Sequence, residues 1–285
     1  SGEFCIKNIY NFKFFSYNNA MKRKILMIVE YNGADFYGWQ KQNGKRTVQG
    51  ELEEKIFMLT KEKCVVEGSG RTDKGVHALN QVAVVTLSSP IPLNNFKIAL
   101  NKLLSDDVVV KKVKLANADF HPRFDAKRKT YEYVVDTSKT RRATFYNLIT
   151  YYPYKVDLER MRRATSLFIG KHNFKAFCSA HTNVSSYERE IYEFKILTRG
   201  NKIKFIITGN GFLYNMVRII VGTLLEIEKI GEENIVKAFT TGERSLTGKT
   251  MPPNGLYLKK VEYFDKKWKS LLQNALMYDK IWVEK

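Results

Sequence analysis

The sequence predicts an α+β protein whose sheets are mostly antiparallel and backed by helices. Two observations lead to this class. Strand-like and helix-like segments alternate irregularly along the chain, and neighbouring strand patterns are joined by tight turns such as Arg199-Gly200-Asn201. The 285 residues, 44% of them apolar, are enough for one large domain or two modest ones with a buried core.

Short runs of β-branched and aromatic residues that end at turn residues indicate strands. The first run, 25–31, is apolar and ends at Asn32-Gly33. The other expected strands cover 82–87, 108–115, 130–136, 191–197, 202–208 and 256–264.

Apolar residues spaced three or four positions apart indicate helices. Thr47 is expected to cap the first helix, and Asp157 to cap a helix over 158–169. The longest helix is expected over 212–227. Its core face would consist of Leu213, Val217, Ile220 and Leu224. Further helices are expected over 96–104 and 232–240.

The chain divides into four predicted parts. Residues 1–20 differ from the rest in composition and are interpreted as a disordered upstream extension, because no signal-peptide pattern is present. An N-terminal α+β domain is expected over 21–125 and a C-terminal α+β domain over 126–264. The tail, 265–285, is expected to be helical.

Net charge points to a polyanionic partner. Lys and Arg total 48 against 29 Asp and Glu, which gives +19; a general lysine bias is the alternative explanation. No segment reaches the ~20 uncharged apolar residues that cross a bilayer. The three cysteines are widely spaced, which favours a reducing compartment. We therefore expect a cytoplasmic protein that binds nucleic acid and no membrane.

The segment 68–78 carries three glycines and two opposite charges within eight residues, at Gly68, Gly70, Arg71, Asp73 and Gly75. Such a stretch contributes little to packing, so it is expected to be a loop with unusual backbone angles just before a strand. From these residues alone, a functional loop and a charged turn with a local ion pair both remain open.

Within this segment, Gly-Arg-Thr-Asp-Lys-Gly-Val-His-Ala at 70–78 resembles the signature of the TruA family of tRNA pseudouridine synthases. Other segments resemble the same family in the same order, at 31–40, 120–133, 211–222 and 252–256. The last has Met251 where the family usually has alanine. The resemblance spans residues 22–264.

The resemblance implies a two-domain pseudouridine synthase fold around a central basic cleft. It implies an isomerase that converts uridine to pseudouridine without a cofactor or metal. Its targets would be positions 38, 39 and 40 in the anticodon stem-loop of tRNA, and the enzyme would be a homodimer.

The resemblance also assigns site residues. Asp73 would be the catalytic carboxylate and nucleophile, Arg218 would pair with it, and Tyr131 would stack on the uracil. Four further residues are expected to bind substrate: Arg71, Gln40, His77 and Arg123.

These roles agree with the chemistry, but the residues alone leave alternatives. A carboxylate can stabilise a cationic ribose, attack C1′ or take a sugar proton. By helical periodicity, Arg218 lies opposite the apolar face and would point to solvent. Tyr131 shares a strand face with Tyr133 and could belong to a cross-strand aromatic ladder.

Several basic residues are candidates for contacts with the RNA backbone, although most isolated lysines are expected to be solvated surface. The candidates are Lys22, Arg23, Lys24, Lys41, Lys45, Arg46, Arg123, Lys127, Arg128, Lys129, Arg141 and Arg142.

Two other patterns are rejected. The P-loop-like segment 242–250 has one residue too many between its glycines. His172, Cys178 and His181 lack a further ligand to complete a metal site. Two rival functions remain: a related synthase with another RNA target, and a non-catalytic RNA-binding module with the same fold.

Overall fold

The computed structural model describes residues 21–179 and 184–263. The predicted extension and tail lie outside these residues, as does His181. The strands are β1 (Arg23–Tyr31), β2 (Glu67–Gly68), β3 (His77–Leu87), β4 (Val108–Ala116), β5 (Arg128–Asp136), β6 (Thr150–Tyr151), β7 (Gly170–Asn173), β8 (Glu188–Arg199), β9 (Lys202–Gly209) and β10 (Leu256–Glu262). The helices are α1 (Val48–Thr60), α2 (Leu93–Leu103), α3 (Leu158–Ala164), α4 (Met216–Leu225), α5 (Ile227–Ile230) and α6 (Glu232–Thr241).

A single sheet runs through the described chain in the order β4-β1-β3-β10-β5-β9-β8-β7, with β2 paired to β3 and β6 to β5. Two pairings are parallel, β3 with β10 and β5 with β6, and the others are antiparallel. The predicted α+β class with mostly antiparallel pairing is therefore confirmed.

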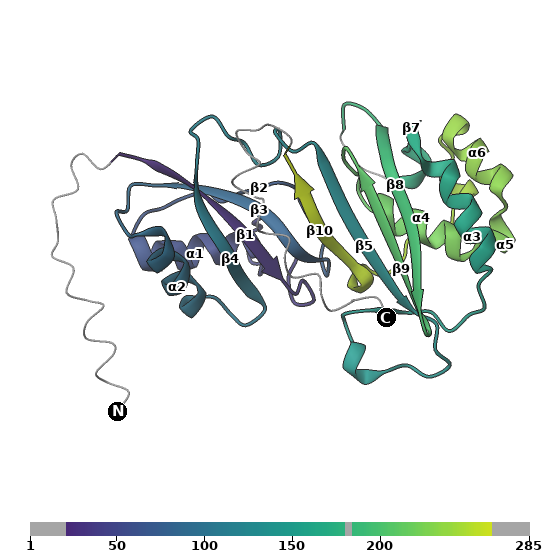
Figure 1. Cartoon of the computed structure of the whole chain (residues 1–285), viewed down its shortest axis with the longest axis horizontal. Helices are drawn as coiled ribbons and strands as arrows, with labels where there is room; N and C mark the ends of the chain where they lie inside the picture. Colours follow the sequence, from purple (N-terminus) through teal and green to yellow (C-terminus); the bar gives the residue numbers. More distant parts are fainter. Residues whose placement is uncertain (1–20, 180–183, 264–285) are drawn as a thin grey trace.

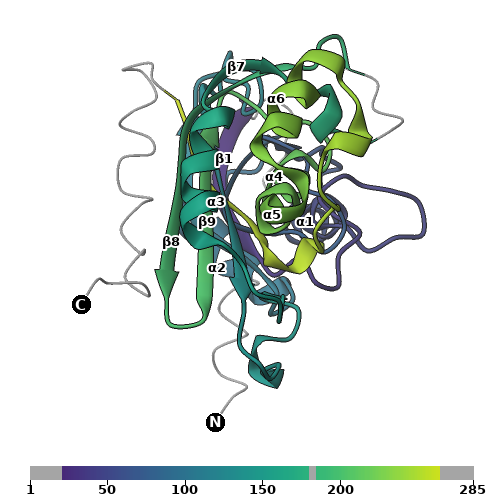
Figure 2. The same ribbon diagram turned by 90° about the vertical axis from the view of Figure 1, so that its right-hand side faces the viewer.

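The helices gather at the two ends of the sheet. In Figure 1, α1 and α2 accompany β1 and β4, whereas α3 to α6 accompany β7 to β9. Figure 2 shows α3 to α6 on one side of β8 and β9. The division into domains at residue 125 stays a prediction, since the sheet continues across that position. No helix in the two described stretches combines the length and apolar content that a bilayer crossing requires.

The first half packs α1 against the sheet as expected. Val48, Leu52 and Ile56 of α1 are fully buried. The Thr47 hydroxyl accepts a hydrogen bond from the amide of Gly50, so the predicted cap is confirmed. Along the sheet, β3 begins at His77, five residues before the predicted start. Its early residues pair with remote segments, β1 and β10, which local pattern does not reveal.

The predicted helix over 212–227 is shorter than expected. Helix α4 begins only at Met216, because Asn215 has a left-handed φ of 60°. It has 10 residues and α1 has 13, so the expectation of the longest helix was wrong. The four residues of the predicted core face, Leu213, Val217, Ile220 and Leu224, are all buried, but burial extends beyond that face. Nine of the ten residues of α4 are buried, all except Arg218, because the helix lies between the sheet and segment 247–251.

Close approach of a second segment explains the glycine at position 222. A Cβ at Gly222 would lie 1.9 Å from the carbonyl oxygen of Lys249. The segment after α6 therefore packs directly on the backbone of α4. Earlier in this half, Asp157 caps α3 by accepting from the amide of Arg160, as predicted. The α-helix ends at Ala164, and 165–168 form a 3-10 turn in place of the expected continuation.

Candidate functional site

The glycine-rich segment forms a loop between β2 and β3, held against the loop after β1. The amide of Trp39 donates to the carbonyl of Thr72, and the amide of Gly75 donates to that of Phe36. A Cβ on Gly38, whose φ is 82°, would lie 2.4 Å from the Thr72 carbonyl oxygen. Only glycine permits this approach, so the two loops carry their glycines for a common reason.

Side-chain hydrogen bonds fix both sides of the same loop. The hydroxyls of Thr72 and Tyr31 share a hydrogen bond of 2.8 Å. On the other side, Gln81 donates to the carbonyl of Gly70 over 2.7 Å and accepts from Ser69. Thr72, Ser69 and Gln81 are buried, whereas Arg71 is exposed and Asp73 is half-buried. The loop therefore presents Asp73 and Arg71 from a rigid support.

Asp73 is a carboxylate without a protein partner. Burial raises its pKa, and the nearby positive charge of Arg218 opposes that rise. Across the described residues, its side chain makes no hydrogen bond and no ion pair within 4 Å. The carboxylate oxygens are thus available to a substrate, while Arg218 favours their ionised form.

Arg218 faces Asp73 and not solvent. Its Nε donates to the Met251 carbonyl and its Nη1 to Oδ1 of Asn215, both over 2.6 Å. These two bonds fix the direction of the guanidinium group. Burial lowers the pKa of Arg218, whereas the negative charge of Asp73 raises it. The expectation from periodicity, a solvent-facing arginine, was wrong because β5 and the Asp73 loop cover that side of α4.

Tyr131 extends from the middle of β5 toward Asp73. Burial raises the pKa of its hydroxyl, and the charge of Asp73 contributes to the rise. Its ring packs edge-on against Phe212, with centroids 5.1 Å apart. The hydroxyl of the nearby Tyr133 is already hydrogen-bonded within the protein, since it contacts Thr150 and donates to the Pro252 carbonyl. The Tyr131 hydroxyl, in contrast, has no hydrogen bond in the described parts of the chain.

The four other predicted site residues differ in solvent exposure and in their hydrogen bonds. Arg71 and Arg123 are exposed. Gln40 donates to Gln49 on α1 over 2.8 Å. His77 is buried, accepts from the Gly33 amide at Nδ1, and contacts the Asn254 carbonyl through Nε2. Its ring stacks on Tyr257 and burial lowers its pKa. Gln40 and His77 thus connect loops around the site.

Sequence reasoning assigned no role to Tyr31 or Phe212, although both lie within quoted motif segments. Tyr31 is buried, holds Thr72, and affects the pKa of Tyr131. Phe212 forms the wall beside Tyr131. An aromatic residue inside a motif is the signal that could have identified them, but packing partners from distant strands are needed to assign the role.

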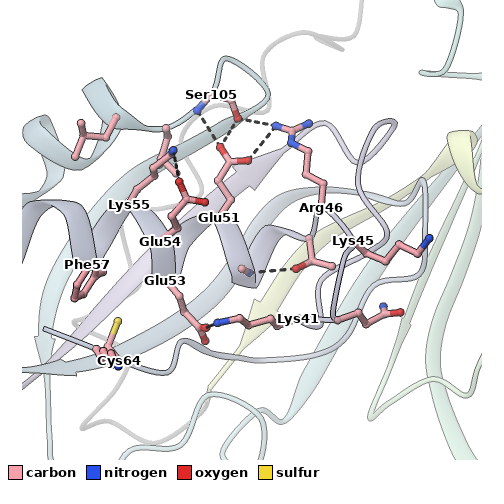
Figure 3. A pocket seen from close by; sticks show the side chains of 16 residues that line it. Lys41, Lys45, Arg46, Glu51, Glu53, Glu54, Lys55, Phe57, Cys64 and Ser105 are labelled. Carbon is pink, nitrogen blue, oxygen red and sulfur yellow. Dashed lines mark hydrogen bonds and ion pairs between the residues drawn. The ribbon is translucent and has the colours of Figure 1, made fainter. Parts of the chain in front are cut away.

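A hollow lies elsewhere, beside α1. Its volume is about 910 Å³, and none of the seven predicted site residues lines it. Figure 3 shows Lys41 pointing toward Glu53 and Arg46 toward Glu51, whereas Lys45 points away from them. Lys41 pairs with Glu53 at 2.8 Å, and Arg46 pairs with Glu51 at 3.0 Å. Because these charges are already paired, this hollow is a weaker candidate than the Asp73 loop.

A metal centre finds no support in the described residues, where no three His, Cys, Asp or Glu side chains cluster suitably. His172, from the rejected metal pattern, contacts the Ile169 carbonyl and stacks on Phe239. The groups that converge at the candidate site are instead a carboxylate, a guanidinium and a phenol. Such a set suits charge stabilisation and proton transfer next to a flat ring.

Comparison with known proteins matches the chain to a family model described as tRNA pseudouridine synthase, over residues 27–125 and 164–264. A tRNA pseudouridine synthase A of Caldicellulosiruptor bescii is 44% identical over 243 residues, covering 85% of this chain and 100% of the relative. One from Geobacillus sp. (strain WCH70) is 45% identical over 246 residues, covering 85% and 99%.

Among solved structures, an archaeal box H/ACA sRNP Nop10-Cbf5 complex aligns with a TM-score of 0.32 and 13% identity. The alignment covers 84% of this chain and 57% of that one. So weak a likeness carries no argument here, whereas the family match confirms the assignment made from the ordered motif segments.

Proposed function

The chain belongs to the tRNA pseudouridine synthase family, and we propose that Asp73 is the carboxylate with which this isomerase acts on uridine. The reaction breaks the C1′–N1 bond, turns the uracil and joins C1′ to C5. The C5 proton leaves, and N1 of the product carries a proton, so substrate and product have the same atoms. The observation that carries the proposal is the half-buried, unpartnered carboxylate of Asp73 facing Arg218 and Tyr131.

Arg218 supports this role through charge. A carboxylate that acts at C1′ must be ionised, and burial alone works against ionisation. Arg218 opposes that effect without an ion pair shorter than 4 Å, so the oxygens stay accessible. Its bonds to Met251 and Asn215 hold the charge in place before substrate binds.

Tyr131 offers a ring on which an everted uracil can stack. An enzyme that modifies a base must take it out of the stack, and aromatic side chains hold such bases. Phe212 fixes the ring from one side. The hydroxyl has no protein partner, so we further propose that it assists removal of the C5 proton.

The substrate-binding part of the proposal rests on exposure and on the family resemblance. Arg71 and Arg123 are exposed and contact the RNA, whereas Gln40 and His77 act by positioning the loops that they join. The resemblance further supports uridines 38, 39 and 40 as targets, in a basic cleft shaped by both subunits of a homodimer. The free thiol of Cys64 agrees with a cytoplasmic location.

Tritium release from tRNA labelled at C5 of uridine tests the proposal. Wild type should release tritium. Asp73→Asn should release none, a loss of at least about 1,000-fold, while still binding tRNA. Asp35→Asn is a matched control, because Asp35 is exposed in the neighbouring loop. Equal release by Asp73→Asn and wild type would remove Asp73 from the mechanism.

The pH profile gives a second readout. Arg218→Ala removes the charge that lowers the pKa of Asp73, so burial acts unopposed and the pKa rises. Activity should therefore appear at higher pH than in wild type, with tRNA affinity less affected than turnover. A loss of affinity alone, with an unchanged pH profile, would contradict the role given to Arg218.

A further inference from the structure

Lys129 is a partly buried cation beside the Asp73 loop. It lies on β5 two residues before Tyr131, on the same strand face. Its Nζ approaches the loop so closely that a Cβ on Gly70 would lie 3.3 Å from it. Loss of surrounding water, together with the charges of Arg123 and Arg189, lowers the pKa of Lys129 to about 8.

Arg189 approaches the same place from β8. Lys129 on β5 is opposite Gly209 on β9, and Gly209 is opposite Ile191 on β8. Arg189 lies two residues before Ile191, near the start of β8. A Cβ on Gly211 would lie 3.7 Å from its Cδ and Nε. Its Nη1 donates to the carbonyls of Ser186 and Glu188, and Nη2 has no hydrogen bond in the described stretches. Gly70 and Gly211 thus let these two side chains approach the backbone closely.

These cations have no carboxylate partner. Within 4 Å, neither Lys129 nor Arg189 forms an ion pair with any residue of 21–179 or 184–263. Another buried lysine of the sheet, Lys204, does have a carboxylate partner. The side chain of Lys204 is 9% exposed and pairs with Glu132 at 3.3 Å. Partly buried cations close together repel one another unless an anion lies among them. The missing anion at Lys129 must come from outside the described chain.

A role for Lys129 as the base of the reaction is less well supported. The charge of Asp73 affects the pKa of Tyr131 and Arg218, but it is not among the influences on Lys129. Lys129 therefore lies to one side of the reacting carboxylate. Lys129 can therefore contact a group next to the everted uracil, but not the uracil itself.

We propose that Lys129 and Arg189 together bind one phosphate of the RNA backbone next to the everted uridine. The inference rests on the proposed function, since it takes RNA as the ligand. Phosphate oxygens accept charge-assisted hydrogen bonds from both side-chain types. Holding this phosphate fixes how deeply the nucleotide enters, so that C1′ meets Asp73.

Protonation is coupled to this binding. Below pH 8 the amine is already charged and ready for phosphate. Above pH 8, binding must first add a proton, so affinity falls as pH rises. The charged groups that act on Lys129 are Arg123, from the loop before β5, and Arg189, from β8. The adjacent strands place the uncharged Gly209 and Val261 opposite it.

The test combines protein variants with neutral linkages in the RNA. Full-length tRNA is assembled with a single methylphosphonate, 5′ or 3′ of the target uridine, and affinity is measured against salt. Lys129→Met should weaken binding to unmodified tRNA about tenfold and reduce the salt slope by about one phosphate contact. Lys127→Met is the comparison variant, because Lys127 is exposed two residues away and any backbone contact that it makes would be to a different phosphate.

Non-additivity identifies the phosphate. At one of the two linkages, the methylphosphonate should weaken wild type about tenfold and cause a clearly smaller further loss in Lys129→Met, because only the Arg189 contact to that phosphate then remains. In Lys127→Met the two losses should add. Losses that add at both linkages for Lys129→Met would overturn the proposal. Lys129→Arg should bind well and, unlike wild type, should keep its affinity above pH 8; equal pH dependence would also count against it.

The wild-type reaction keeps this inference separate from the proposed function. Tritium release from unmodified tRNA by wild type tests the reaction alone. Release together with additive losses refutes only the phosphate site. Absence of release refutes the proposed function, whatever the linkages show.

Discussion

The two faces of strand β5 solve the same electrostatic problem in opposite ways. On one face, Glu132 is 5% exposed and receives Lys204 and Lys259, at 3.3 and 2.5 Å. On the other face, Lys129 and Tyr131 lie beside the Asp73 loop, with no ion pair and no side-chain hydrogen bond to any residue of 21–179 or 184–263. Alternate residues of one strand thus form two different faces. We call the face with Glu132 the neutralised face, because its charges are paired, and the face with Lys129 and Tyr131 the unsatisfied face. The difference shows where the protein leaves interactions for a ligand to complete.

The largest effect on stability is expected on the neutralised face. Glu132→Gln removes the charge that compensates Lys204 and Lys259, so unfolding free energy should fall by about 3 kcal/mol. Lys259 is 23% exposed and can turn to solvent, which limits the loss. Chemical denaturation measures it, with the exposed Glu193→Gln as a control that costs less than about 0.5 kcal/mol. An equally small loss for both would break the comparison.

Tyr131→Phe tests the unsatisfied face through rate. The hydroxyl holds no protein group, so its removal should leave the melting temperature almost unchanged. If it assists proton removal at C5, single-turnover tritium release should slow by about 100-fold. Tyr133→Phe is the contrasting variant, because it removes bonds to Thr150 and Pro252 and should lower stability. A stability loss confined to Tyr131→Phe would reverse the assignment of the two tyrosines.

Lys129→Met should stabilise the protein without RNA, by about 1–2 kcal/mol, since each unit of pKa shift represents about 1.4 kcal/mol and some water remains. The sign follows from linkage. The folded state releases its proton near pH 8 and the unfolded state near 10.5, so wild type gains stability between these values. The advantage of the variant should be full below pH 8 and fade toward 10.5. A stability difference that stays constant with pH would instead mean that the gain in Lys129→Met comes from packing.

The smallest effect is expected for Thr130→Val on the neutralised face. The hydroxyls of Thr130 and Thr208 share a hydrogen bond of 2.9 Å, and both residues are buried. Losing that bond should cost about 1 kcal/mol in thermal denaturation and leave tritium release unchanged. The double variant with Thr208→Val should restore part of the loss, because both polar groups are then gone. A slower reaction would mean that the two faces are coupled.

Local signals were predictable from sequence and remote contacts were not. The caps at Thr47 and Asp157 depend on neighbouring amides, and both were predicted. Helical periodicity alone pointed the side chain of Arg218 to solvent, because periodicity contains no information about the loop that faces this side of the helix. The ends of α4 were missed because the left-handed angle at Asn215 interrupts an otherwise helical pattern.

The same distinction applies to the candidate site. Asp73, Tyr131 and Arg218 were identified because ordered motifs resemble a known family. The special position of Lys129 was not, since a lysine in a basic stretch is usually solvated. Its isolation from acids depends on β8, β9 and the Gly70 loop meeting in space. Strands β2 and β6 have two residues each, too few to give a periodic signal.

Strand β10 is the last strand of the described chain, yet it lies in the middle of the sheet, between β3 and β5. More than a hundred residues separate it from the end of β5. At about 5–20 residues per second, the ribosome needs on the order of 10 s to make them. During that time the nascent chain exposes two unpaired strand edges, which invite aggregation. If Asp73 and Tyr131 act together as proposed, the site is complete only after β10 has inserted between β3 and β5, which requires the chain up to residue 262.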